Sequence, residues 1–254
     1  MSKLKLMTII GTRPEIIRLS EVIKKCDVYF DQTLVHTGQN YDYSLNQIFF
    51  EDLGLRRPDK YLDSACRDLG ETIGKIIAAS YRLMQEERPD ALLILGDTNS
   101  CLSSIAAKRL HIPIFHMEAG NRCFDECLPE ETNRRIVDHI ADVNLCYSEH
   151  ARRYLLAEGR PKERTFVTGS PMAEVLRANL TKIEASDVLQ RLALSPQQYL
   201  LLSAHREENI DDKNNFIELF TAVNRLAQTY DMPVLYSCHP RSRKALEARK
   251  FPID

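Results

Sequence analysis

The chain has 254 residues, of which 44% are hydrophobic and 28% charged, and its formal net charge is -2. This apolar content can build a substantial core in one large or two smaller domains, which excludes a largely disordered chain. Acidic and basic residues are mixed along the sequence, so charge gives no case for a nucleic-acid or anionic-membrane partner. We therefore expect a small-molecule partner.

Seven cysteines without paired spacing favour a reduced protein without disulfides. No apolar segment approaches the length of a transmembrane helix. The sequence thus predicts a soluble, cytoplasmic protein.

Short apolar runs rich in β-forming residues alternate with amphipathic stretches, the pattern of a doubly wound α/β fold with parallel strands. The predicted strands are Leu6–Ile10, Gln32–His36, Ala91–Leu95, Ile112–His116, Val143–Tyr147, Thr165–Thr168, Tyr199–Ser203 and Val234–Ser237. The predicted helices include Ile16–Lys25, Leu69–Glu87, Leu102–Leu110 and Glu131–His139.

The first six strands predict a Rossmann-like domain over residues 1–169. Residues 170–254 supply only two strands of a second, partial domain. Ser170 is the predicted N-cap of the connecting helix, with Pro171 at its first position.

Ligands of an open parallel sheet bind beyond the carboxyl ends of its strands. In "IIGTRPEIIRL" a strand ends at Ile10, and Thr12-x-x-Glu15 predicts a capping box. The helix N-terminus and Arg13 would suit a phosphate or carboxylate, although a capped helix with a surface arginine explains the loop equally well. With Gly11 alone, there is no GxGxxG dinucleotide motif.

Two carboxylates follow two successive predicted strands. Asp97 alone is best interpreted as an acid at a helix start, but Glu118 follows the next strand in the same way. Together they predict a site at one sheet edge that moves a proton. His116 is predicted to be a packed strand residue rather than a catalyst.

A third carboxylate, Glu130, lies in the first turn of the helix that starts at Pro129. Asn133 and Arg134 follow on the same face. For Glu131 and Arg135 we favour a simpler interpretation, an acid that complements the helix dipole and a solvated arginine.

Cations follow both strands of the partial domain, at His205 and Arg206 and again at His239. A cleft between two Rossmann-like units with cations on one side and acids on the other suits a nucleotide sugar. Cys123 and Cys127 could supply two metal ligands, but the sequence offers no second pair to complete a four-ligand site, so we expect no metal.

The ordered motifs "GTRPE", "TGQN", "GDTNS", "HMEAGNR", "PEETNRR", "TGSP" and "HREEN" resemble the non-hydrolysing UDP-N-acetylglucosamine 2-epimerase family along essentially the whole chain. The segments "HTGQNYDY", "NRCFD", "RRIVDH" and "ARRYLLAEG" look closest to its UDP-N-acetyl-L-fucosamine synthase branch, which acts on UDP-2-acetamido-2,6-dideoxy-L-talose for capsule or O-antigen synthesis.

The resemblance implies a glycosyltransferase-B-like pair of Rossmann-like domains, the second incomplete here. It implies an isomerase without a cofactor, which eliminates UDP across C1–C2 and adds it back after reprotonation. The implied partner is a UDP-N-acetyl sugar, and the full-length protein is expected to be a homodimer. By motif, the implied catalytic residues are Asp97, Glu118, Glu130 and His205, and the implied substrate-binding residues are Arg13, Arg122, Arg134, Arg206 and His239.

Two departures from the family pattern keep alternatives open. Cys127 stands where the branch has a basic residue, and the nucleotide-holding motif of the second domain would lie beyond Asp254. The alternatives are a UDP-N-acetylglucosamine/UDP-N-acetylmannosamine 2-epimerase, a glycosyltransferase of the same architecture, and an inactive truncated nucleotide-sugar binder.

Overall fold

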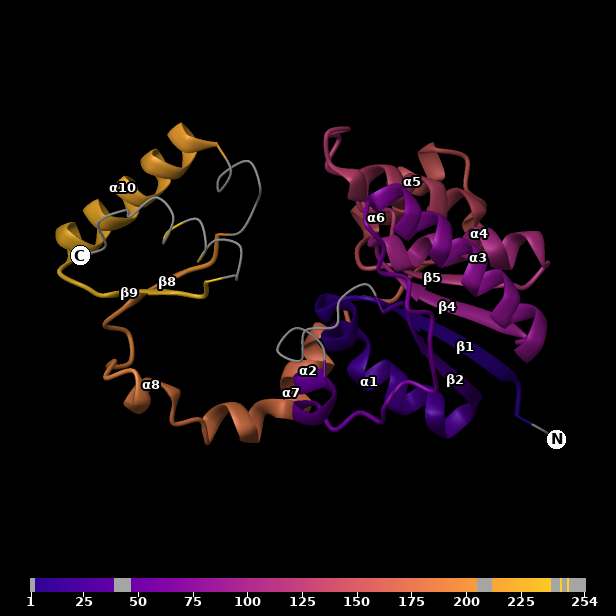
Figure 1. Ribbon diagram of the computed structural model, residues 1–254, viewed down its shortest axis with the longest axis horizontal. Coiled ribbons are helices and arrows are strands. Elements are labelled where there is room, and N and C mark those ends of the chain that lie inside the picture. The colour runs from indigo at the N-terminus through magenta and orange to yellow at the C-terminus, as the bar shows by residue number, and fades with distance from the viewer. Residues whose placement is uncertain (1–2, 39–46, 205–211, 239–242, 244–245, 247–254) are drawn as a thin grey trace. The chain divides into compact units, whose positions relative to one another are not determined.

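The computed structural model describes residues 3–38, 47–204, 212–238, 243 and 246. The chain divides into two compact units, residues 1–181 and 182–254, and each is considered by itself (Figure 1). The predicted domain boundary near Gly169 lies just ahead of helix α7 (Met172–Glu184), most of which belongs to the first unit.

The first unit is built on a seven-stranded sheet whose strands are all parallel. Its order is β3-β2-β1-β4-β5-β6-β7, so the direction of strand addition reverses between β1 and β4. The strands are β1 (Lys5–Ile10), β2 (Asp31–His36), β3 (Lys60–Tyr61), β4 (Ala91–Leu95), β5 (Ile114–Ala119), β6 (Val143–Cys146) and β7 (Thr165–Val167). The predicted parallel α/β fold is confirmed.

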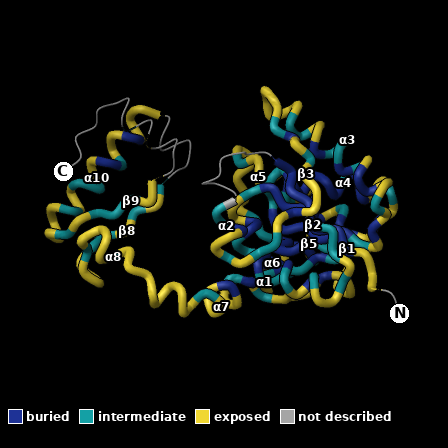
Figure 2. The backbone as a smooth tube through the Cα atoms, turned by 60° about the horizontal axis from the view of Figure 1, so that its bottom comes forward, coloured by how far each residue is buried: buried dark blue, intermediate teal, exposed yellow. Residues whose placement is uncertain are grey.

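Helices cover both faces of this sheet, because alternate strand residues are apolar on both sides (Figures 1 and 2). Met7 and Ile9 of β1 pack in the cluster that includes α3 (Leu69–Glu87) and α4 (Ser103–Arg109), whereas Leu6 and Ile10 pack in the cluster that includes α1 (Arg13–Tyr29). The helices are α1 (Arg13–Tyr29), α2 (Gln47–Asp52), α3 (Leu69–Glu87), α4 (Ser103–Arg109), α5 (Pro129–Ile140) and α6 (Glu149–Ala157), with 3₁₀ turns at η2 (Asn99–Leu102) and η3 (Lys162–Arg164).

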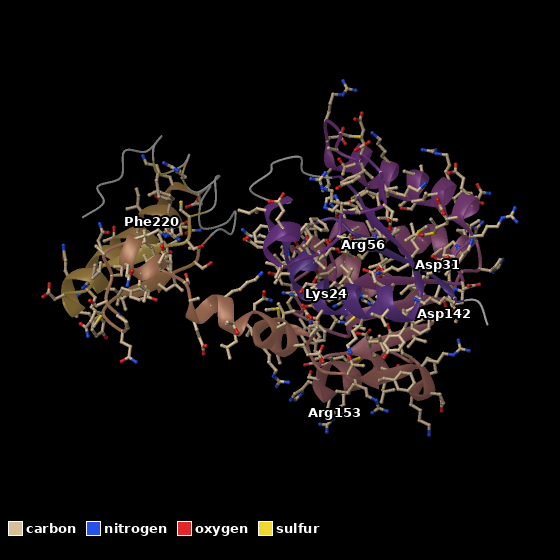
Figure 3. The ribbon with its side chains drawn as sticks, turned by 90° about the horizontal axis from the view of Figure 1, so that it is seen from below. Lys24, Asp31, Arg56, Asp142, Arg153 and Phe220 are labelled. Atoms are coloured by element: carbon tan, nitrogen blue, oxygen red, sulfur yellow. The ribbon has the colours of Figure 1, made fainter. Side chains whose placement is uncertain are left out.

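The second unit pairs two parallel strands, β8 (Leu200–Leu202) and β9 (Val234–Tyr236), with helix α10 (Lys213–Tyr230) between them in the chain. A short helix, α8 (Val188–Arg191), precedes β8. Phe216 and Phe220 form its buried core, with ring centroids 4.6 Å apart (Figure 3 labels Phe220). Its strand–helix–strand order is that of the predicted partial Rossmann-like domain.

The structure differs from the predicted elements in three places. The strand predicted at Ile112–His116 is β5, which begins two residues later, after Pro113, and continues through an irregularity between Met117 and Ala119. β3 was not predicted, because its two residues are exposed and carry no apolar pattern. The helix predicted from Leu102 follows a 3₁₀ turn.

Two absences that the sequence predicts can be examined. All seven cysteines lie among the described residues, and no disulfide joins any of them. Within the described part of the chain, no helix combines the length and apolar character needed to cross a bilayer.

Gly120 is required by a close approach of the backbone. It has φ +80°, and a Cβ atom there would lie 2.4 Å from the carbonyl oxygen of Ala151 in α6. Gly159 has a similar φ of +83°, but a Cβ atom there would have no neighbour within 4 Å. The two glycines therefore separate the effect of crowding from that of the left-handed backbone.

We expect Gly120→Ala to destabilise the protein by about 1–3 kcal/mol more than Gly159→Ala, because both strain the backbone but only the first overpacks it. Urea unfolding of both variants measures the difference. Equal losses would mean that α6 can move away from position 120 without a penalty.

Candidate active site

The site lies where the strand order reverses. Adjacent parallel strands β1 and β4 end there and their loops separate, as expected for a ligand site in an open α/β sheet. The loop after β4 begins at Gly96, which has φ +69° and donates its N–H to Met117 O at 2.9 Å. A Cβ atom on Gly96 would lie 3.3 Å from Glu118 Oε2. The missing side chain thus leaves room for the Glu118 carboxylate.

Glu118 is held in an uncommon backbone conformation, with φ +64°, at the irregular end of β5. Such strain in a residue other than glycine concentrates at functional sites. Its carboxylate pairs with Arg18 of α1 and accepts a hydrogen bond from Asn121 Nδ2 at 3.3 Å. Burial, with a contribution from the nearby charge of Asp97, raises the pKa of Glu118. The charges of the two strand-end carboxylates, Asp97 and Glu118, therefore interact.

Asp97 is fixed by α5. Its carboxylate pairs with Arg134, and its backbone carbonyl accepts a hydrogen bond from Asn133 Nδ2 at 2.9 Å. Arg134 also contacts Glu131 at 3.0 Å. The face of α5 that carries Asn133 and Arg134 thus faces the loop after β4. The Arg134 guanidinium forms ion pairs with the carboxylates instead of pointing into solvent.

Glu130 and Glu131 have opposite surroundings. Glu130 is exposed and has no hydrogen-bond or ion-pair partner among the described residues. Glu131 lies in the first turn of α5, as predicted for an acid that complements the helix dipole, but only 1% of the residue is exposed. It accepts the Cys123 N–H at 3.1 Å and pairs with Arg135 at 3.1 Å. Burial opposes ionisation, but hydrogen bonds from Cys123 and the two arginines lower the pKa of Glu131 to about 2.

Behind the carboxylates lies a buried charged network centred on Asp138, which sequence reasoning missed. Its oxygens accept the Gly120 N–H and contact His116 Nδ1 at 2.9 Å and Arg122 at 2.7 Å. The other ring nitrogen of His116 lies 2.8 Å from Gly96 O. Although burial raises it, His116 and Arg122 bring the pKa of Asp138 below its ordinary value. The network holds the backbone on both sides of Asp97 and Glu118.

The predicted cations are placed in three ways. The side chain of Arg122 is fully buried and also pairs with Glu158 at 2.6 Å, so its guanidinium is occupied within the protein. Arg13 is exposed, 5.8 Å from the ring centroid of Phe49. His205, Arg206 and His239 lie outside the described residues.

Two groups at the site were not predicted. Arg18, which pairs with Glu118, lies in α1 five residues after Arg13 and carries no loop motif. Tyr147 directly follows β6, and its hydroxyl is buried without a partner among the described residues. Burial and the charge of Glu118 raise the pKa of Tyr147. Its place at the end of a predicted strand was the signal that could have identified it.

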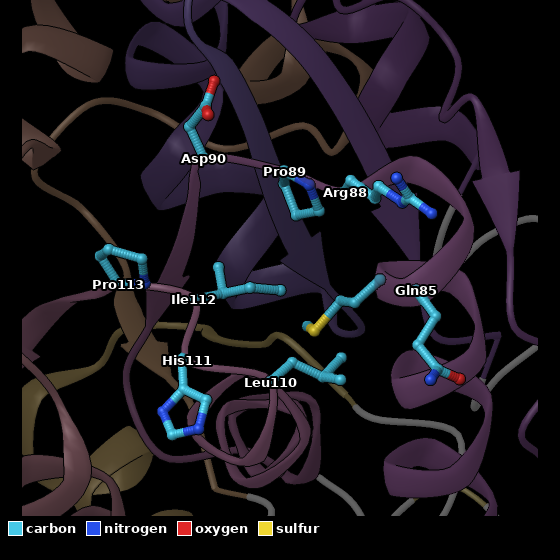
Figure 4. A pocket seen from close by; sticks show the side chains of 9 residues that line it. Gln85, Arg88, Pro89, Asp90, Leu110, His111, Ile112 and Pro113 are labelled. Carbon is cyan, nitrogen blue, oxygen red and sulfur yellow. The ribbon is translucent and has the colours of Figure 1, made fainter.

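The described residues include no cluster of three or more histidine, cysteine or acidic side chains suited to a metal. A cavity of about 530 Å³ lies at the opposite edge of the sheet, where β4 and β5 begin (Figure 4). It is lined by residues that include Arg88, Asp90 and His111. It is thus separate from the carboxylate cluster.

Known proteins have the same fold and similar sequences. A profile of the family described as "UDP-N-acetylglucosamine 2-epimerase" matches residues 24–252. The structure of UDP-N-acetylglucosamine 2-epimerase from Rickettsia bellii is 53% identical with a TM-score of 0.89, covering 96% of this chain and 64% of that one. The Methanocaldococcus jannaschii UDP-GlcNAc 2-epimerase, solved in complex with UDP-GlcNAc and UDP, is 33% identical with a TM-score of 0.89, covering 97% and 69%.

A third relative is named for a different sugar. The UDP-2,3-diacetamido-2,3-dideoxy-D-glucuronate 2-epimerase of Pseudomonas aeruginosa is 34% identical, over 99% of this chain and 71% of its own. The chain therefore spans about two thirds of the length of these three proteins.

The adjacent acids Glu130 and Glu131 of α5 provide a test of the lowered pKa of Glu131. Because its folded pKa of about 2 lies below the ordinary 4.5, Glu131 stabilises the fold above pH 4.5, and this contribution is lost as the pH falls through 2. We expect the unfolding free energy of Glu131→Gln to be lower than that of the unmodified protein at pH 7. The difference should shrink on acidification towards pH 2.

The neighbouring Glu130→Gln is the matched control, because that side chain is exposed and has no described partner. Urea unfolding from pH 7 to pH 2 measures all three proteins. A Glu131→Gln curve parallel to that of the unmodified protein would contradict the lowered pKa.

Proposed function

The chain belongs to the UDP-N-acetylglucosamine 2-epimerase family of non-hydrolysing isomerases, and we propose that it interconverts UDP-N-acetylglucosamine and UDP-N-acetylmannosamine. The observation that carries the proposal is the pair of carboxylates, Asp97 and Glu118, at the reversal of strand order, each paired with an arginine. Carboxylates can transfer a proton, and arginines can stabilise the negative charge of a departing anion.

Epimerisation at C2 requires that a weakly acidic proton leave one face of the sugar and that a proton arrive on the other. In the proposed reaction, UDP leaves from C1 as the C2 proton is removed, giving a 2-acetamidoglycal, and it adds back after protonation on the opposite face. Atoms are conserved and no oxidant is needed. Two acids at one site suit such a cycle, since one accepts a proton while the other returns one.

We assign the proton-returning role to Glu118. Burial raises its pKa, so this carboxyl binds a proton more readily than an exposed glutamate does. Asp97, paired with Arg134, is proposed as the base. Arg18 lies within reach of the diphosphate in this proposal, since it is beside Glu118 and its side chain is 37% exposed.

The other predicted residues keep proposed roles. Glu130 is proposed as a further acid/base group, exposed and unengaged, and Arg13 as a nucleotide contact. His205, Arg206 and His239 are proposed to bind the diphosphate from the second unit. For Arg122 the contacts with Asp138 and Glu158 favour a positioning role. Assembly as a homodimer and a cytoplasmic location complete the proposal.

The names of the relatives favour the hexose pair over the predicted L-fucosamine branch, since two of the three are named for UDP-N-acetylglucosamine. The third is named for a UDP-diacetamido sugar, so relatives of similar identity differ in their sugars. UDP-N-acetyl-L-fucosamine is therefore the second substrate to test.

Proton NMR in deuterium oxide tests the proposal, since a C2 proton that is removed and replaced by solvent deuterium loses its signal. We expect this loss with UDP-N-acetylglucosamine and without an acceptor, which a glycosyltransferase would require. Loss with UDP-N-acetyl-L-fucosamine alone would move the assignment to that branch. UDP binding without exchange of any sugar would indicate a non-catalytic binder and reject the mechanism.

Single substitutions assign the acids. We expect Asp97→Asn and Glu118→Gln each to slow C2 exchange by about a hundredfold or more, the usual effect of losing a general acid or base. Glu163→Gln, an exposed acid in η3, is the control and should exchange at the normal rate. Exchange at the normal rate in either site variant would remove that residue from the proposed reaction.

A further inference from the structure

Glu15 does not form the predicted capping box. It lies in the first turn of α1 with 1% of the residue exposed. The Thr12 side chain makes no capping hydrogen bond, and its hydroxyl instead donates to Glu15 Oε2 at 2.8 Å. The same oxygen accepts the Gly11 N–H at 3.0 Å. The carboxylate therefore accepts hydrogen bonds from neighbouring groups instead of capping the N-terminus of α1.

Two of these donors come from the loop after β4. Thr98 Oγ1 donates to Glu15 Oε2 at 3.0 Å, and Ser100 Oγ donates to Oε1. The two hydroxyl oxygens also lie 2.9 Å apart. Glu15 has no ion-pair partner among the described residues, and burial raises its pKa despite the four donors. A buried carboxylate satisfied only by hydroxyls and an amide is an uncommon and specific arrangement.

This arrangement joins two loops that the sheet itself leaves apart. The paired register of β1 and β4 runs from Leu6–Ala91 to Thr8–Leu93, and the sheet pairs no residues of the two chains beyond it. One loop leads to Arg13, and the other carries Asp97. Glu15, on the rigid start of α1, reaches across the separation to the residues that directly follow Asp97.

We propose that Glu15 is a positioning residue that fixes the loop Gly96–Leu102, and with it the Asp97 carboxylate, against the start of α1. The proposal rests on the proposed function for the role of Asp97. Arg134 and Asn133 hold Asp97 from the side of α5, and Glu15 holds the following residues from the side of α1. Removing one support leaves the acid near its place but no longer fixed in it.

Substitution of Ser100 tests the link without removing the buried carboxylate. Ser100→Ala deletes one donor to Glu15, and Thr98→Val deletes another with little change in shape. Ser104→Ala is the matched control, because this nearby hydroxyl is also buried but has no partner among the described residues. Amide hydrogen exchange then reports on the loop, including the Cys101 N–H, which bonds Thr98 O at 3.0 Å.

We expect Ser100→Ala and Thr98→Val to speed exchange of the Cys101 amide by about tenfold and to lower kcat for C2 epimerisation by about tenfold or more, with KM changed less than about twofold. Ser104→Ala should leave all three quantities unchanged. Unchanged amide exchange in both site variants would overturn the proposal. So would a looser loop with unchanged kcat, or a raised KM alone.

The two hypotheses can fail separately. If the unmodified protein shows no C2 exchange with any UDP sugar, the proposed function fails. Amide exchange still decides whether Glu15 fixes the loop that carries Asp97.

Discussion

The parallel pairing of β1 with β4 is the constraint on which the site depends. Because strands are added outward in both directions from this pair, the loops that leave their carboxyl ends must run to opposite sides. The separation opens space at the edge of the sheet without removing any strand from the core. The same separation deprives the two loops of backbone hydrogen bonds to each other, so side chains have to fix them.

Besides Asp97, four carboxylates fix or occupy this edge, and their desolvation is offset by different partners. Asp138 contacts a histidine and an arginine, and Glu131 accepts hydrogen bonds from Cys123 and two arginines, so both have lowered pKa values despite burial. Glu15 receives hydroxyls and an amide, and Glu118 a single arginine beside another acid, and burial keeps both pKa values raised. The pKa of each carboxyl therefore depends on the balance between its desolvation and the hydrogen bonds and charges that reach it. The edge thus holds two carboxyls with lowered pKa values, Asp138 and Glu131, near Glu118, whose pKa is raised.

The sequence predicts much of the fold and the outline of the site. Parallel strands appear as apolar runs because both of their faces are buried, which is why six of the seven strands in the first unit could be identified. The exposed pair Lys60–Tyr61 carries no such pattern. Asp97 and Glu118 could be brought together because strand ends share an edge. The network of Asp138 could not be predicted, because its partners His116, Gly120 and Arg122 come from another part of the chain. The burial of Glu131 could not be predicted either, because it depends on how the loop at Cys123 folds over the start of α5.

Glu15 shows the limit of local reasoning most clearly. Its spacing from Thr12 fits a capping box, and both residues do interact, but the carboxylate is used by Thr98 and Ser100, more than eighty residues away. A local motif specifies which groups lie near one another, but it does not specify which of several donors forms a hydrogen bond with the carboxylate. At the reversal of strand order, the donors without a backbone partner are those of the two separating loops. A carboxylate that satisfies both loops at once removes more unpaired polar groups than one that caps its own helix, and this favours the long-range arrangement.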